Sequence, residues 1–206
     1  QSGDIYALDL ATGCAHWTYS AGAEVRSSLS LGHISGQPNP VLYMGDFSAT
    51  VHAVDALNGS LVWRTAVGDH PDATITGSPK LHDGTLYVPM SSSEWATAAD
   101  PGYACCTFQG GVVAIDAASG ELQWRNHVID KPAVETSEKN PFGAPRKGPA
   151  GAPVWNSPTI DADRGVLYIG TGEGYTSPAA DTSDAVLAFS LETGERQWAT
   201  QLLGGD

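Results

Sequence analysis

The chain has 206 residues, and its 24 Gly, 13 Pro and 16% charged residues favour a turn-rich β protein over a helical one. A formal net charge of −13 makes nucleic acid and anionic membranes unfavourable partners. No apolar run approaches the roughly 18 residues of a membrane span, and three cysteines do not predict a disulfide scaffold.

An eleven-residue segment occurs four times without gaps. The copies are ALDLATGCAHW (7–17), AVDALNGSLVW (53–63), AIDAASGELQW (114–124) and AFSLETGERQW (188–198). Each predicts a strand, a turn closed by glycine and a second strand ending in tryptophan, with a turn aspartate in the first three copies accepting amide hydrogen bonds. We expect each tryptophan to be largely buried between neighbouring sheets. Four unrelated hairpins, the alternative, would not share one register.

Two more strands are predicted ahead of the second, third and fourth copies. The segments are SSLSLGHISGQPNPVLYMG, SPKLHDGTLYVPM and SPTIDADRGVLYIG. Together with the repeated hairpin they give four antiparallel strands per unit, which is a β-propeller blade. We therefore predict an all-β fold, one partial propeller domain over residues 1–206 with about three and a half to four blades ending near residues 17, 63, 124 and 198.

The chain is expected to be a piece of a longer one, because such an array leaves two open sheet edges. A leader is expected to have been removed or to lie upstream, since a strand-like segment begins directly at Gln1. Two insertions, 89–110 and 126–154, fall between strands and are predicted to build one functional face.

Equivalent positions at the start of the innermost strands carry side chains suited to a flat anionic ligand. The strands are predicted at VRSSL, ITGSP and VWNSP, which align Arg26, Thr76 and Trp155. With a strand period of two, these side chains share a face, where they could pair with carboxylates, donate a hydrogen bond and stack. The alternative is a core tryptophan and a charge at a strand end.

Acidic residues follow the next strand of three units. Asp46, Glu94 and Glu173 come after LYMG, LYVPMSSS and LYIGTG, so we expect them at one rim. Carboxylates that meet there would repel one another unless a cation such as Ca²⁺ joined them. Solvated loop acids are the alternative, above all for Asp46.

Adjacent cysteines lie in the first insertion. Cys105 and Cys106 could close a disulfide between neighbours and form a rigid surface against a planar ligand. They could equally be reduced, or one could pair with Cys14.

The repeated AxDxxTGxxxW pattern resembles that of the eight-bladed, pyrroloquinoline-quinone (PQQ)-dependent alcohol dehydrogenases. GCAHW at 13–17, CCTFQGGVVAID at 105–116 and GTGEGYTSPAADTSDAVLAF at 170–189 look most like the polyvinyl alcohol dehydrogenase branch. The resemblance implies a site for the quinone and for Ca²⁺ on matching positions. The residues implied for the quinone are Arg26, Thr76, Ser91 and Trp155, and those for calcium are Glu94 and Glu173.

Two features depart from the family pattern. The second calcium ligand of the family is usually Asn, whereas this chain has Glu173. The family's adjacent cysteines precede the matched arginine, where this chain has Ser20–Ala21, which puts in doubt the contact of Cys105 and Cys106 with the quinone. The aspartate expected as catalytic base would lie beyond Asp206.

The resemblance implies oxidation of an alcohol such as polyvinyl alcohol or another secondary alcohol. Electrons would pass from PQQ to a cytochrome c, in the periplasm or outside the cell. Two alternatives remain: a cofactor-free propeller that serves as a binding scaffold, and a quinoprotein that has lost its cofactor.

Overall fold

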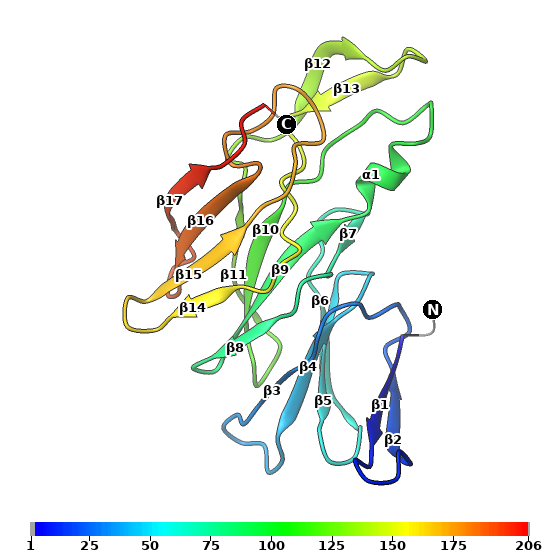
Figure 1. Cartoon of the computed structure of the whole chain (residues 1–206), viewed down its shortest axis with the longest axis vertical. Coiled ribbons are helices and arrows are strands. Elements are labelled where there is room, and N and C mark those ends of the chain that lie inside the picture. The colour runs from blue at the N-terminus through cyan, green and yellow to red at the C-terminus, as the bar shows by residue number, and fades with distance from the viewer. Residues whose placement is uncertain (1–2, 206) are drawn as a thin grey trace.

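The computed structural model describes residues 3–205, whose strands form five antiparallel sheets (Figure 1). Four of these sheets are here called blades 1 to 4, in chain order. Blade 1 has two strands, β1 (Asp4–Leu8) and β2 (Ala15–Ser20). Blade 2 has four, β3 (Ser30–Gly32), β4 (Val41–Gly45), β5 (Thr50–Asp55) and β6 (Leu61–Ala66).

Blades 3 and 4 repeat the order of blade 2. In blade 3 the first strand is divided, and both of its parts pair with the second strand. The strands are β7 (Ala73–Thr74), β8 (Lys80–His82), β9 (Thr85–Ser92), β10 (Gly111–Asp116) and β11 (Leu122–His127). Blade 4 has β14 (Thr159–Asp161), β15 (Val166–Gly170), β16 (Ala185–Ser190) and β17 (Arg196–Gln201). The predicted partial propeller is confirmed.

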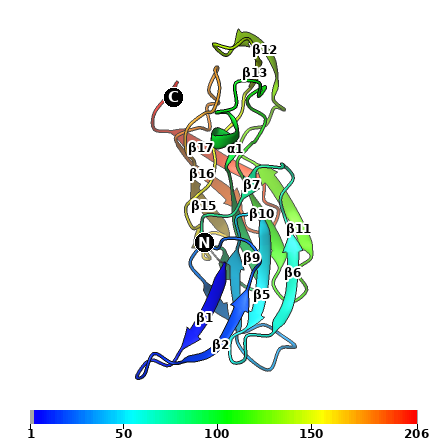
Figure 2. The same ribbon diagram turned by 90° about the vertical axis from the view of Figure 1, so that its right-hand side faces the viewer.

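Two elements lie outside the blades. The helix α1 (Glu94–Thr97) follows β9, and the hairpin β12 (Val134–Lys139) and β13 (Pro145–Gly148) lies in the second insertion. Both lie at the same end of the blades in Figures 1 and 2. In the part of the chain that the structure describes, no helix is long and apolar enough to cross a membrane.

The central strands of blade 3 are buried on both faces and feed two cores. Side chains alternate along a strand, so Val113 and Ile115 of β10 join the core shared with blade 2. Val112 and Ala114 of the same strand join the core shared with blade 4. Face-to-face packing of blades therefore accounts for both cores.

A tyrosine, an alanine and a tryptophan form a cross-strand row in each complete blade. In blade 2, Tyr43 pairs with Ala53, which pairs with Trp63. The tyrosine and tryptophan ring centroids lie 5.8–5.9 Å apart in all three blades because the small alanine lets the rings meet over it. The equivalent residues of blades 3 and 4 are Tyr87, Ala114, Trp124, Tyr168, Ala188 and Trp198.

The repeated hairpin turns have the predicted geometry. Oδ1 of Asp55 accepts hydrogen bonds from the amides of Leu57 and Asn58, and the first and third copies use Asp9 and Asp116 in the same way. All four turns close on a glycine with positive φ. The residues are Gly13, Gly59, Gly120 and Gly194.

The tryptophans dock on the turn of the following blade. Nε1 of Trp17 donates to the carbonyl of Ala56 at 3.2 Å, and Nε1 of Trp63 donates to that of Ala117 at 3.0 Å. Three of the four are half-buried, and Trp198 is 45% exposed. The prediction of four largely buried tryptophans is therefore wrong for Trp198, since no sheet within residues 3–205 covers blade 4 on that side.

Candidate functional site

The longest connections between strands lie at one end of the blades, here called the insertion end (residues 92–110, 128–158 and 171–184). The four hairpin turns lie at the opposite end, here called the turn end (Figure 1). Asp46, Glu94 and Glu173 follow β4, β9 and β15, whose final residues all lie at the insertion end. That the three carboxylates meet at one rim stays a prediction.

The three predicted ligand residues occupy equivalent places, but not within strands. Arg26, Thr76 and Trp155 each precede a bend, and regular pairing of the innermost strand begins four residues later, at Ser30, Lys80 and Thr159. The expectation that alternation along a strand would align their side chains is therefore wrong, although the equivalence of the three positions holds.

Side chains at the bend replace the missing strand pairing. Oγ of Ser27 donates to the carbonyl of Gly45 in blade 2, and Nδ2 of Asn156 donates to that of Gly170 in blade 4. Blade 3 has Gly77 at the bend, and a methyl group there would lie 2.7 Å from the ring of Pro89. Pro89 takes the place that Gly45 and Gly170 have in the other blades, and it has no amide hydrogen that needs an acceptor. Blade 3 therefore does not need a hydrogen-bonding side chain at its bend.

The three bends lie side by side. The amide of Ser28 donates to Oγ of Ser78 at 2.8 Å, which joins the bends of blades 2 and 3. A methyl group at Gly77 would lie 2.5 Å from the carbonyl oxygen of Asn156, so the bends of blades 3 and 4 also touch. The structure thus brings the three segments together at the innermost edge of the blades.

Arg26 is engaged by a neighbour. Its Nε and Nη2 donate to the two carboxylate oxygens of Glu24 at 2.6 and 3.1 Å, and its guanidinium lies 4.4 Å from the ring centroid of Phe47. Half of the side chain is exposed. The hydrogen bonds from Arg26 hold the pKa of Glu24 below its ordinary value, so this pair is ionised at neutral pH.

Four buried hydroxyl groups at or beside the insertion end lack hydrogen-bond partners, those of Thr74, Thr76, Tyr175 and Thr182. Ser92 is a side-chain neighbour of the Tyr175 hydroxyl. Ser91 is buried and pairs with Thr74 across β7 and β9. Buried polar groups are normally satisfied, so unpaired hydroxyls at one place indicate a polar ligand.

Trp155 offers an aromatic surface at this place. Its side chain is 49% exposed, although a buried core position was the alternative. A methyl group at Gly172 would lie 2.6 Å from Cζ2 of the indole, so glycine allows that loop to pack closely on the ring. A half-exposed indole of this kind can stack on a flat ligand.

The three acidic residues have different surroundings. Asp46 is 2% exposed and accepts hydrogen bonds from the amides of Ser48 and Thr50 and from Nε2 of His52. It is therefore neither a solvated loop acid nor free for a cation.

Glu94 is fully buried, and both carboxylate oxygens accept backbone hydrogen bonds. The carboxylate of Glu173 has no partner among residues 3–205. Burial raises the pKa of the Tyr175 hydroxyl, and the charges of Glu173 and Glu94 raise it further.

Cys105 and Cys106 are joined in a disulfide, across a cis peptide bond, and Cys14 is free and exposed. The disulfide is therefore confirmed over the alternatives. It borders a cavity of about 190 Å³ together with Tyr103, Asn140, Arg146 and Tyr175.

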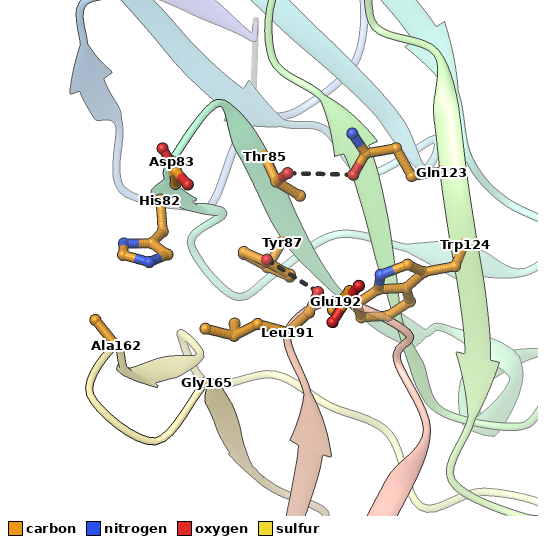
Figure 3. A pocket seen from close by; sticks show the side chains of 10 residues that line it. All are labelled: His82, Asp83, Thr85, Tyr87, Gln123, Trp124, Ala162, Gly165, Leu191 and Glu192. Carbon is orange, nitrogen blue, oxygen red and sulfur yellow. Dashed lines mark hydrogen bonds between the residues drawn. The ribbon is translucent and has the colours of Figure 1, made fainter.

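A larger groove of about 560 Å³ lies elsewhere, between blades 3 and 4 (Figure 3). Trp124, Tyr87 and Gln123 line it from blade 3, and Leu191 and Glu192 from blade 4. Its dashed contacts, Tyr87 Oη to the carbonyl of Leu191 and Thr85 Oγ1 to Gln123, hold neighbouring strands and blades together. None of the predicted site residues lines this groove, which is the space beside a docked tryptophan.

Two family models match the chain. Residues 96–206 match the β-propeller domain of glucose, ethanol and alcohol dehydrogenases, and residues 1–137 match the outer membrane protein assembly factor BamB. The chain belongs to the PQQ-dependent alcohol dehydrogenase family.

Relatives in this family cover the whole chain. Polyvinylalcohol dehydrogenases of a Pseudomonas species and of Sphingopyxis sp. (strain 113P3) are 38% and 37% identical over 100% of it. The crystal structure of quinohemoprotein alcohol dehydrogenase from Comamonas testosteroni has a TM-score of 0.71, at 22% identity, over 100% of this chain and 33% of that one. The chain spans about a third (32%) of the length of the curated relatives it matches.

The insertion end of this quinoprotein fits the quinone better than it fits calcium. Unpaired hydroxyls and a half-exposed indole suit an oxygen-rich planar group. Among residues 3–205, however, no three His, Cys, Asp or Glu side chains gather as metal ligands. Both oxygens of Glu94 accept backbone hydrogen bonds, whereas the carboxylate of Glu173 accepts none within these residues.

Sequence reasoning missed Thr74 and Tyr175. Thr74 lies two residues before Thr76, and alternation along β7 could have drawn attention to it. Tyr175 follows Glu173 in a loop, and nothing in the repeats indicates that its ring packs against Gly151.

Proposed function

We propose that the insertion end binds PQQ and that the intact protein oxidises an alcohol. The observation that carries this proposal is the group of unpaired buried hydroxyls beside the half-exposed Trp155, in a member of a quinoprotein family. Trp155 would stack on the quinone, and Thr76, with Ser91 beside it, would hydrogen-bond its oxygens. Arg26 would exchange Glu24 for a carboxylate of the ligand, retaining a paired guanidinium.

Bound PQQ would supply the oxidising power, accepting two electrons with the hydrogen of the alcohol carbon. Residues of this chain would hold and orient it, while the base for the hydroxyl proton, an expected aspartate, would come from outside residues 1–206. Calcium stays a prediction: no three His, Cys, Asp or Glu side chains gather within the described residues, so ligands beyond Glu94 and Glu173 would come from other groups.

Polyvinyl alcohol or another secondary alcohol is the proposed substrate, because two relatives at 37–38% identity are named for that polymer. A cytochrome c is the proposed electron acceptor, in keeping with the quinohemoprotein relatives. A disulfide between Cys105 and Cys106 suits an oxidising compartment, and we propose a periplasmic or secreted location.

Reconstitution of the full-length protein with PQQ, followed by dye-linked oxidation of polyvinyl alcohol, tests the proposal. Dye reduction that needs both quinone and alcohol supports it. The second candidate function is a cofactor-free scaffold, which the match of residues 1–137 to BamB favours. Absence of PQQ binding to the intact protein would favour that candidate.

A further inference from the structure

Glu94 combines complete burial with an ionisable group. It is the first residue of α1, is 0% exposed, and its amide donates to Oγ of Ser92 at 2.8 Å. A carboxylate in such surroundings is costly unless hydrogen bonds compensate for the lost water. The hydrogen-bond partners of its carboxylate therefore indicate its role.

The hydrogen-bond donors to the Glu94 carboxylate all belong to the loop that carries the disulfide. The amides of Thr107 and Phe108 donate to Oε1 and Oε2 at 2.7 and 2.8 Å. The hydroxyl of Tyr103 donates to Oε1 at 2.8 Å. These donors lie on both sides of Cys105 and Cys106 in the sequence, so one carboxylate fixes both ends of the disulfide turn.

Other contacts complete the support of this loop. His70 bonds Oγ1 of Thr107 at 2.9 Å, and its Nε2 lies 3.6 Å from Oε1 of Glu94. On the other side the disulfide is bonded to β13, because the amide of Lys147 donates to the carbonyl of Cys105 and the amide of Cys106 donates to that of Lys147. The disulfide is thus held between Glu94 and the hairpin of the second insertion.

Glu173, the acid in the equivalent connection of blade 4, has no side-chain partner within residues 3–205. It therefore provides a matched control for the role of Glu94.

We infer that Glu94 is a positioning residue for the disulfide loop. It fixes the disulfide as one wall of the cavity that Tyr103, Arg146 and Tyr175 also line. This inference concerns the loop and does not require that PQQ binds.

The test compares the full-length protein with Glu94→Gln and, as a matched control, Glu173→Gln. The rate of disulfide reduction by a phosphine is followed by alkylation and mass spectrometry. The exposed thiol of Cys14 serves as an internal standard for labelling. We expect reduction of the Cys105–Cys106 disulfide to be roughly tenfold faster in Glu94→Gln, since only one good acceptor remains, and unchanged in Glu173→Gln.

A further readout separates positioning from a general loss of structure. Hydrogen exchange at the amides of Thr107 and Phe108 should accelerate in Glu94→Gln, while exchange in the β10–β11 pair stays the same.

A reduction rate within twofold of that of the unmodified protein would overturn the inference, and so would unchanged hydrogen exchange at Thr107 and Phe108. If Glu94→Gln fails to fold, Tyr103→Phe removes one donor to Glu94 and leaves the backbone intact. It should speed disulfide reduction about threefold, and an unchanged rate would overturn the inference equally.

Discussion

The two ends of the blades are built in different ways. At the turn end the same contacts recur from blade to blade: a bulge after the alanine, an aspartate or serine that accepts turn amides, and a tryptophan against the next glycine. At the insertion end, each connection has its own length and contacts.

Three equivalent acids make the contrast clear. Asp46 closes a short turn and bonds His52, Glu94 holds an eighteen-residue connection between β9 and β10, and Glu173 has no partner among residues 3–205. The repeat thus supplies a scaffold at one end, and loss of repetition at the other supplies a site, as in other repeat folds. The following substitutions would sharpen or break this comparison.

Asp46→Ala should have the largest effect on stability and would show that blade 2 uses its insertion end structurally. It leaves two amides and the imidazole of His52 without an acceptor, and we expect a loss of about 3 kcal/mol in the free energy of unfolding. Denaturant unfolding measures it. A loss below about 1 kcal/mol would contradict the structural role.

The same carboxylate makes stability depend on pH. Burial works to raise the pKa of Asp46, but hydrogen bonds from His52 and from the amides of Thr50 and Ser48 outweigh it and leave the pKa below 3.8. A depressed pKa stabilises the folded state above the ordinary value, and the contribution is lost as pH falls through the folded pKa. The stability gap between the unmodified protein and Asp46→Asn should therefore be constant near pH 6 and shrink below about pH 4.

Gly120→Ala tests the turn end against a control with the same backbone. Both Gly120 (φ +76°) and Gly84 (φ +75°) have positive φ, but a methyl group at Gly120 would lie 2.7 Å from the ring of Trp63 and one at Gly84 would meet nothing within 4 Å. We expect Gly84→Ala to cost about 1 kcal/mol from backbone strain and Gly120→Ala about 2 kcal/mol or more. Equal losses in denaturant unfolding would show that the docked tryptophan does not matter.

The smallest expected effect is the difference in the free energy of unfolding between Trp63→Phe and Trp124→Phe. Nε1 of Trp63 donates to the carbonyl of Ala117, whereas Nε1 of Trp124 has no acceptor within residues 3–205. Both changes remove similar ring area, so we expect Trp63→Phe to cost about 1 kcal/mol more. If Trp124→Phe proves the costlier change, the docking hydrogen bond is not what stabilises the blade interface.

Much of the fold follows from the repeats because each copy contains the residues that determine its own turn and docking contact. The bends at Ser27, Gly77 and Asn156 could not be predicted in this way, since their geometry depends on Gly45, Pro89 and Gly170 in another strand. The exposure of Trp198 likewise depends on what packs beside blade 4 and not on the motif.

The candidate site was predictable in its position and less so in its contacts. Alignment of the three bend segments predicted that Arg26, Thr76 and Trp155 lie together, and the segments do lie side by side. Only the fold reveals that Glu24 pairs with Arg26. The sequence shows acids at one rim, and only the surrounding amides distinguish Glu94 from Glu173.

The central claim is that Trp155 at the insertion end, and not the groove beside Trp124, receives the quinone. Titration of the full-length apoprotein with PQQ tests it most directly. We expect Trp155→Ala to weaken binding about tenfold, which corresponds to the upper range of aromatic stacking, and Trp124→Phe to leave the affinity unchanged. Equal affinities for the unmodified protein and Trp155→Ala, or weaker binding in Trp124→Phe alone, would contradict the account.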